Sequence, residues 1–421
     1  MANNFDSNFT RKLAKVFLDK FESERVLSKN VNTQLLSGKF GSDTGDTVDF
    51  KRPTDYTSKR TSGGDISGGD RSSIITGKAS GTVQDYFTVD VDFDEADEAL
   101  KMDQLDTLLA PMATRIKTDL ELDFGEFCMK NTSLLAGSVG TAVTTWDHVA
   151  RAGAIMQASG VPMDSELCYF ANPFTQTKLA SNQRSLGGET GAMSANQKAT
   201  ISDNFAGMRV MTASTLPSYT TGAGADRAGT LSGTPTATYL AAKDTMTMSI
   251  AVTAFQANLV VAAGETITVT GRNRLNLSTR KPIVDETGAQ ILFSGTVTAA
   301  VTLNGSGAGT LVITGPGVYE AAGAFNTVDS ALTSGDVVTL GGAASTLIQP
   351  NLFWHKQAFG IGSVPIKKLY STDTIATTED GLQFRVSKYA NGDANKQIVR
   401  FDFRPAYAVL NPFFAGKSFG G

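Results

Sequence analysis

Residues 41–81 read GSDTGDTVDFKRPTDYTSKRTSGGDISGGDRSSIITGKASG. Near the start of this stretch Val48 and Phe50 alternate with polar residues, as in a strand, until Pro53 ends the alternation. Glycines follow near the middle, with charged residues on both sides of them. A two-stranded excursion of this length has too little apolar surface to be stable alone. We therefore expect an extended loop that lies on another surface.

An amphipathic helix is predicted ahead of this loop, within residues 1–40. Its apolar residues recur at helical spacing among charged side chains: Leu13, Val16, Phe17, Leu18 and Phe21. The pattern fits a helical arm that reaches a neighbouring molecule and, equally, a helix docked on its own domain. After the loop, residues 82–93 show strand-like alternation.

The strongest helical pattern lies between Pro111 and Lys130, where apolar residues repeat at three- and four-residue steps. We expect Pro111 in the first turn, where its missing N–H has no consequence. Two shorter helices follow. Thr144 or Thr145 begins one that ends near Gly160, and Asn172 followed by Pro173 begins the other.

Residues 222–345 differ in composition from the rest of the chain. Only 14 of these 124 residues are Asp, Glu, Lys or Arg, about 11% against 19% for the whole chain. Short Val/Ile/Thr runs alternate with Gly, Asn and Ser, which predicts a small all-β barrel or sandwich. The run GETITV at 264–269 recurs as GDVVTL at 335–340, as expected for two equivalent strands. The composition then reverts, so we interpret 222–345 as a domain inserted into a host domain.

Composition and motifs indicate no catalytic, metal or cofactor site. His148 and His355 are the two histidines, and neither lies in a motif of a general base or a metal ligand. Asp43, Asp46 and Asp49 lack the spacing of a calcium loop. The acidic strand residues Asp90, Asp92 and Asp94 share one face, usually a solvated one, although it could meet a basic partner. The Gly-rich turns lack a following Gly-Lys-Ser/Thr.

The cysteines, the hydropathy and the net charge further restrict the kind of protein that the sequence encodes. Cys128 and Cys168, the two cysteines, have apolar neighbours and favour buried thiols in a reducing compartment over a disulfide. No apolar run is long enough to cross a bilayer, and the N-terminal segment does not read as a secretory signal. Net charge is −4 without a basic stripe, which argues against a dedicated nucleic-acid-binding domain. We therefore expect a protein that acts through contacts between copies.

Several segments resemble the major coat proteins of short-tailed phages of the Salmonella and Shigella type. The resemblance spans nearly the whole chain, is strongest in the C-terminal block and is weakest within 222–345. The matching segments are TGDTVDFKRP at 44–53, GDIS at 64–67, LLAP at 108–111, TDLE at 118–121, QPNLFWHKQAFGIGSVPIKKL at 349–369 and KYANGDANKQIVRFDFRPAYAVLNP at 388–412.

This resemblance implies an α+β fold, the tailed-phage capsid fold shared with herpesvirus capsids, with an inserted all-β barrel. The implied parts are an N-terminal arm, an extended loop, a spine helix, a peripheral domain and an axial domain. The arm would be residues 1–40 and the extended loop 41–81. The peripheral domain would be 82–160, with the spine helix at about 103–131. The axial domain would be 161–221 together with 346–421. The C-terminal run would be partly peripheral, and residues 222–345 would be the barrel, an insertion thought to assist folding and to bridge capsomers.

The resemblance also implies function and partners. The chain would be a non-enzymatic shell subunit that forms hexamers and pentamers of an icosahedral capsid. A scaffolding protein, a portal protein and double-stranded DNA held without sequence-specific contact would be its partners, with no membrane. Assembly would take place in the cytoplasm of the bacterial host. We expect contacts between subunits at loop residues Arg52, Lys59, Arg60, Asp65, Asp70 and Arg71, and contacts with the scaffold or a neighbour at arm residues Asp6, Asp19, Glu22 and Glu24.

Two other readings stay open at this point. An encapsulin-like compartment shell shares the implied fold but should lack the β insertion. A bacterial surface protein or adhesin would also be rich in Gly, Thr and β-strands, although the N-terminal segment and the capped internal helices argue against it.

Overall fold

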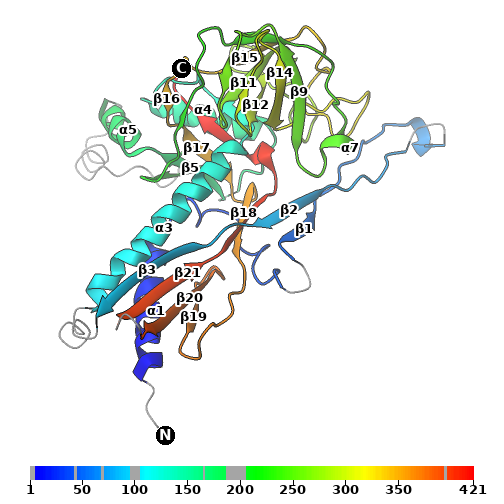
Figure 1. Ribbon diagram of the computed structural model, residues 1–421. Coiled ribbons are helices and arrows are strands. Elements are labelled where there is room, and N and C mark those ends of the chain that lie inside the picture. Colours follow the sequence, from blue (N-terminus) through cyan, green and yellow to red (C-terminus); the bar gives the residue numbers. More distant parts are fainter. Residues whose placement is uncertain are drawn as a thin grey trace. The chain divides into compact units, whose positions relative to one another are not determined.

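The computed structural model describes residues 5–41, 45–67, 71–94, 105–164, 166–185, 205–392 and 396–421. The chain forms two compact units. One comprises Met1–Asp49, Ser80–Gly125 and Phe359–Val409, and the other comprises Phe50–Ala79, Glu126–Ala358 and Leu410–Gly421. Both mix helices and strands (Figure 1), which confirms the expected α+β class. Within the described residues, no helix has the length and hydropathy needed to span a bilayer.

Where the structure describes it, the first unit contains two four-stranded sheets and two helices. One sheet has the order β19-β20-β21-β3 and the other the order β1-β2-β22-β18, and β1, β2 and α3 each continue past a boundary of the unit. The elements are α1 (Phe5–Glu24), β1 (Thr47–Lys51), β2 (Lys78–Val83), β3 (Phe87–Asp94), α3 (Leu105–Lys130), β18 (Phe359–Ser363), β19 (Thr374–Thr377), β20 (Gln383–Asn391), β21 (Lys396–Phe403) and β22 (Pro405–Val409).

The amphipathic N-terminal helix, α1, docks on strands of its own unit. Its apolar face packs on β19 and β20, and Leu13, Phe17 and Phe21 are buried there. The Phe17 ring stacks on Phe401 with centroids 4.8 Å apart, and the Phe21 ring meets Phe384 edge-on at 4.5 Å. Aromatic contacts of this kind add to the burial of apolar area. Of the two readings left open for this helix, the docked one describes the structure.

The spine helix, α3, begins six residues earlier than the sequence pattern predicted. It starts at Leu105, so that Pro111 lies inside the helix rather than in its first turn. A proline there removes one backbone hydrogen bond. Pro111 is exposed, so water can hydrate the carbonyl group that loses its partner. The buried face beyond it follows the predicted spacing through Ile116, Leu120 and Phe124.

The second unit has a host domain built on a five-stranded sheet with the order β4-β23-β17-β5-β6. The helices α4 (Trp146–Ala158) and α5 (Pro173–Ser185) accompany this sheet, and β7 pairs with β16 beside it. The elements are η1 (Ser62–Gly64), β4 (Leu134–Ala136), α4 (Trp146–Ala158), β5 (Leu167–Ala171), α5 (Pro173–Ser185), β6 (Arg209–Thr212), β7 (Tyr219–Thr220), β16 (Leu347–Ile348), β17 (Asn351–His355), η3 (Pro412–Phe414) and β23 (Ala415–Ser418).

One domain expectation differs from this arrangement. Residues 131–160 were expected in the peripheral domain, but α4 packs on β4 and β23 of the host sheet. Val149 and Met156 of α4 belong to the same buried cluster as Phe353, so the apolar face of α4 completes the host core. The C-terminal run was expected to be partly peripheral, and most of it, Phe359–Val409, belongs to the first unit.

The inserted domain is a closed six-stranded barrel with the order β11-β12-β14-β9-β8-β15. The repeated sequence runs are neighbouring antiparallel strands in it, with Ile267 opposite Leu340 and Val269 opposite Val338. The elements are β8 (Ala228–Leu231), α7 (Tyr239–Ala242), β9 (Thr247–Thr253), β10 (Val260–Val261), β11 (Thr266–Asn273), β12 (Leu292–Val297), β13 (Val301–Thr302), β14 (Gly309–Thr314) and β15 (Val337–Leu340).

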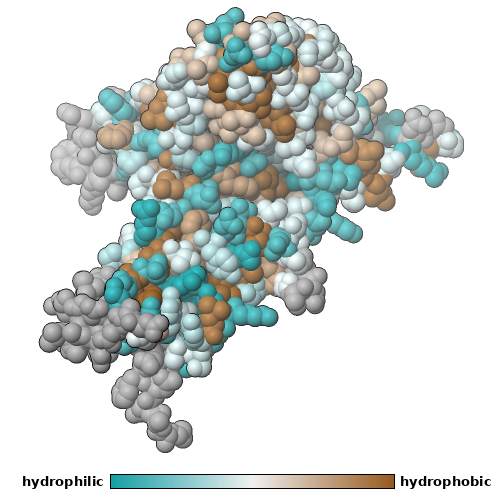
Figure 2. Space-filling model, in the orientation of Figure 1, coloured by the Kyte–Doolittle hydropathy of each residue, from teal (hydrophilic) through white to brown (hydrophobic). Residues whose placement is uncertain are grey.

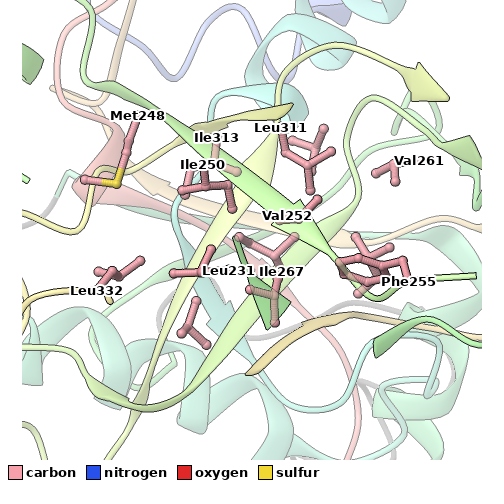
Figure 3. Packing of buried hydrophobic residues seen from close by; sticks show 14 of the residues in the cluster. Leu231, Met248, Ile250, Val252, Phe255, Val261, Ile267, Leu311, Ile313 and Leu332 are labelled. Atoms are coloured by element: carbon pink, nitrogen blue, oxygen red, sulfur yellow. The ribbon is translucent and has the colours of Figure 1, made fainter. Parts of the chain in front are cut away.

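Alternate residues of these strands fill the barrel. In Figure 3 the side chains of Ile250, Val252, Leu311 and Ile313 lie close together inside it. All four are at most 1% exposed. Because the barrel has its own closed apolar core, the predicted all-β insertion is confirmed as a structural module.

Candidate functional site

The base of the extended loop is held by its own chain through Arg52. This side chain is 7% exposed, and its guanidinium donates to the carbonyl oxygens of Lys78 and Leu410. Burial lowers the pKa of Arg52 to about 10. Arg52 was expected at a subunit contact, but a side chain committed to these carbonyls is poorly available to another molecule, so its position speaks against that role.

The same base also rests on the inserted barrel. Asp55 of the loop forms an ion pair with Arg280, and the Lys78 N–H donates to Asp244 Oδ1 at 3.1 Å. Ile75 packs against a buried cluster that includes Tyr239. At Gly77 a Cβ would lie only 2.3 Å from the Lys243 oxygen. Only glycine fits this close approach without a shift of the backbone.

The tip of the loop, residues 56–67 and 71–74, is exposed throughout. Its apolar side chains face solvent, with Tyr56 54%, Ile66 56% and Ile74 75% exposed. Near the tip, Thr57 and Ser72 join the two limbs: their hydroxyls lie 2.9 Å apart, and the Thr57 N–H donates to the Ser72 hydroxyl at 3.3 Å. Figure 2 shows hydrophilic and hydrophobic side chains along this loop. A tip with so few contacts to its own chain offers its surface to another molecule.

Four of the charged residues expected at the tip lie there. Lys59, Arg60, Asp65 and Arg71 are all exposed, while Asp70 lies outside the described residues. Hydrogen bonds from the Ser67 hydroxyl and N–H lower the pKa of Asp65. Asp65 is therefore a carboxylate at neutral pH, set among exposed cations.

The acidic residues expected to meet a scaffold or neighbour all lie on α1. Asp19 is exposed. Asp6, Glu22 and Glu24 belong to the helix, but their side chains lie outside the described part. Since the apolar face of α1 is buried, a partner would have to meet its polar face.

Sequence reasoning missed a buried carboxylate that fixes the chain just after α1. Glu121 of α3 is 1% exposed and accepts hydrogen bonds from the N–H groups of Leu27 and Ser28 at 2.7 and 3.0 Å. Beside it, buried Arg25 pairs with Asp380. Periodicity alone gives no signal for such long-range pairs, because an acid on a helix usually faces solvent.

The acidic face of β3 meets basic residues of its own sheet. In the strand register Asp90 lies opposite Arg400, and Asp94 opposite Lys396. The Lys396 ammonium lies 2.6 Å from Asp92 and lowers the pKa of that carboxyl. Arg400 and Lys396 of β21 thus act as basic partners of this acidic face within the same sheet.

His355 lies in the one group of potential metal ligands found among the described residues, with Asp164 and Glu166. The Gln357 N–H donates to His355 Nδ1 at 3.1 Å, and His355 Nε2 lies 3.0 Å from Asp164. Nδ1 therefore accepts and Nε2 carries the proton. A metal at Nε2 would need that lone pair and would force a proton onto Nδ1, against the Gln357 N–H. The arrangement favours a hydrogen-bonded pair.

The cysteines and His148 occupy structural positions. Cys128 and Cys168 are buried and form no disulfide, and burial raises the pKa of the Cys168 thiol to about 11. A thiol in that state is a poor nucleophile. His148 Nδ1 accepts from the Thr144 N–H at the start of α4.

Comparison with known proteins identifies the family. The family model described as "P22 coat protein - gene protein 5" matches residues 1–421. The major capsid protein of Acyrthosiphon pisum secondary endosymbiont phage 1 is 37% identical, with all of both chains covered. Solved structures with some likeness include Mycobacterium phage Che8 (12% identity, 94% of this chain and 90% of that one, TM-score 0.47) and the mature capsid of bacteriophage PhiM1 (9% identity, 89% and 82%, TM-score 0.44). The chain belongs to the family of P22 coat proteins, the major capsid proteins that form the icosahedral shells of tailed phages.

Proposed function

We propose that this capsid protein builds its shell with the help of an internal scaffolding protein. The shell closes around a portal protein at one vertex and holds double-stranded DNA without sequence-specific contact. The subunit is a building block rather than an enzyme, assembled in the cytoplasm of the bacterial host into hexamers and pentamers. The full-length family match supports this proposal and argues against an encapsulin-like compartment or a surface adhesin.

The observation that carries the proposal is the exposed tip of the extended loop. Its base is fixed on the chain through Arg52 and Asp55, whereas Ile66 and Ile74 face solvent. Exposed apolar groups are stabilised when another molecule covers them. The tip therefore lies over a neighbouring subunit in the shell.

Exposed charges at the tip select the register of that contact. Lys59, Arg60, Asp65, Asp70 and Arg71 pair with opposite charges of the neighbour, and each exposed pair contributes about 0–1 kcal/mol. Weak contacts suffice, because a closed symmetric shell repeats each of them in every subunit. Charge thus gives specificity, and the apolar tip residues give area.

The polar face of α1 is the proposed contact for a basic segment of the scaffolding protein. Asp19 is exposed there, and Asp6, Glu22 and Glu24 lie on the same helix. For the packaged DNA, the net charge of −4 suits a wall that contains a polyanion without binding it strongly.

Expression with and without the scaffolding protein, followed by electron microscopy, tests this proposal. Closed shells of uniform size are expected with the scaffold, and aberrant or fewer particles without it. A protein that stays monomeric at high concentration in both cultures would sink the proposal. A matched pair of variants sharpens the scaffold assignment: Asp19→Lys should reduce scaffold-dependent closure, whereas Asp226→Lys, an exposed acid on the barrel side, should not.

A further inference from the structure

The inserted barrel joins its host domain through a narrow neck. The chain enters and leaves the barrel along β7 and β16, where Tyr219 pairs with Ile348. Just beyond, Thr221 bonds to both ends of the returning segment: its N–H donates to the Thr346 oxygen at 3.0 Å and its hydroxyl to the Ala343 oxygen at 2.6 Å. Further hydrogen bonds join the barrel to its host, among them those from the Leu277 N–H to the Ser159 oxygen at 3.0 Å and from the Ser294 hydroxyl to the Ser133 oxygen at 2.9 Å.

A lysine of the host sheet also takes part in this attachment. Lys417 lies on β23 and is 1% exposed. Its ammonium donates to the carbonyl oxygen of Gly264 and to the Thr296 hydroxyl at 3.3 Å, both on the barrel. It also lies over the Tyr219 ring, 5.5 Å from the centroid. All three of these groups are neutral.

The charges around Lys417 do not balance. Glu265 is the neighbouring carboxylate, and it is already engaged by Arg227 and by the N–H groups of Gly222 and Ala262 at 2.6 and 2.9 Å. A further buried cation, Arg274, donates to the Ser133 and Ser294 oxygens at 2.7 and 2.8 Å. Glu265 is thus the acidic neighbour of both Arg227 and Lys417, and its ion pair is with Arg227.

Lysine is the cation of the three that gives up its proton most readily. Burial lowers the pKa of Lys417 to about 7, with Glu265 acting in the opposite direction. Tyr219 is the other titratable neighbour, and burial raises its pKa well above its usual value. Tyr219 therefore stays neutral while Lys417 changes its charge.

We propose that Lys417 is a protonation-controlled latch between the barrel and the host sheet. As a neutral amine it fits the closed neck. On taking up a proton it becomes a buried, unpaired charge, and release of the barrel turn at 262–265 lets water solvate it. This proposal concerns only the neck of the barrel. If it is wrong, the proposed shell function is unaffected.

The sign of the pH effect follows from the proton balance. In the open neck Lys417 regains its ordinary pKa of about 10.4, so opening takes up one proton wherever the closed neck holds the neutral amine. Above about pH 7 the opening equilibrium should therefore fall about tenfold for each unit of pH. Below that pH both states are protonated, and the equilibrium should be flat.

Hydrogen exchange at the neck tests the latch. The Gly264 N–H bonds to the Val297 oxygen and the Val297 N–H to the Glu265 oxygen, each at 2.8 Å, so both amides report opening. Protection factors, corrected for intrinsic exchange, are compared between pH 6 and 9 for the full-length protein and for K417M and K417R. Val312, inside the β9–β14 ladder, serves as the reporter for opening of the barrel itself.

The expected result is a rise of about tenfold per pH unit in neck protection for the wild type above pH 7, with no change at Val312. K417M, always neutral, should be highly protected at every pH, and K417R, always charged, should be poorly protected at every pH. If wild type and K417M show the same pH dependence at Gly264 and Val297, the latch is wrong, whether or not K417R folds.

Discussion

Arg52 shows how one charged residue in the extended loop differs from its neighbours. Its guanidinium satisfies the Lys78 and Leu410 oxygens in a buried position, whereas Lys59 stands in solvent. We expect Arg52→Ala to lower the free energy of unfolding of the free subunit by about 2–3 kcal/mol, because two carbonyl groups lose a charged donor. Urea unfolding followed by circular dichroism measures this change.

The matched control for this prediction is Lys59→Ala in the same loop. An exposed substitution of this kind should stay within about 0.5 kcal/mol of the wild type. An Arg52→Ala protein as stable as the Lys59→Ala protein would contradict the anchoring role and return Arg52 to the set of subunit contacts.

The position of the extended loop depends on the close approach of its base to the barrel. Gly77 passes so near the Lys243 oxygen that a Cβ would lie 2.3 Å from it, whereas a Cβ at Gly41 would meet nothing within 4 Å. We expect Gly77→Ala to displace the loop base from the barrel and to speed proteolysis at residues 50–79, while Gly41→Ala leaves the cleavage rate unchanged. Limited trypsin digestion of the free subunit measures both rates, and equal rates would show that the base is not fixed there.

Each of the two repeated runs of the barrel carries an acidic residue that pairs with an arginine. Glu265 in the first run pairs with Arg227, and Asp336 in the second pairs with Arg272 through two hydrogen bonds of 2.6 and 2.7 Å. The glycine before each acid has φ of 92°. An acid after a left-handed turn thus ties each strand to an arginine elsewhere in the barrel.

The Asp336 pair predicts a definite pH dependence. Burial alone would raise the pKa of Asp336, but hydrogen bonds from Arg272 and Thr333 lower it overall. A lowered native pKa gives stability that is complete above the unfolded pKa of about 3.9 and is lost as pH falls through the native value. We expect Asp336→Asn to cost about 1–3 kcal/mol at pH 7, and the difference from wild type to shrink below about pH 4. Thermal unfolding across pH 3 to 7 tests it, and a constant difference would contradict the assignment.

Elements defined by local patterns were predictable, and pairings across the chain were not. The barrel strands, the docked face of α1 and the cap at Asn172, whose side chain accepts the Phe174 N–H at 2.8 Å, follow from periodicity and turn chemistry. Glu121 and Lys417 gave no signal, because their partners are 93 or more and 121 or more residues away. Pro111 misled the prediction because an exposed proline can be tolerated inside a long helix.

At the scale of the whole molecule, the structure separates residues that hold the subunit together from residues left for other subunits. Arg25, Glu121, Arg274 and Lys417 are buried and engaged within the chain. Lys59, Arg60 and Arg71 are exposed on the loop tip. Substitutions in the first group should change the stability of the free subunit, and substitutions in the second should change assembly alone.

Charge reversal at the tip tests this separation. Lys59→Glu combined with Arg60→Glu should leave the thermal unfolding of the free subunit unchanged. Loss and reversal of two surface pairs cost on the order of 1–2 kcal/mol per subunit, so the protein concentration needed for shell closure should rise roughly tenfold. Light scattering and electron microscopy measure closure, and added salt should narrow the gap to wild type because it screens exposed charges. The double variant Lys29→Glu with Lys39→Glu makes the same change of charge at exposed positions outside the loop. If it impairs closure as strongly, the effect belongs to overall charge, and the tip is not the contact.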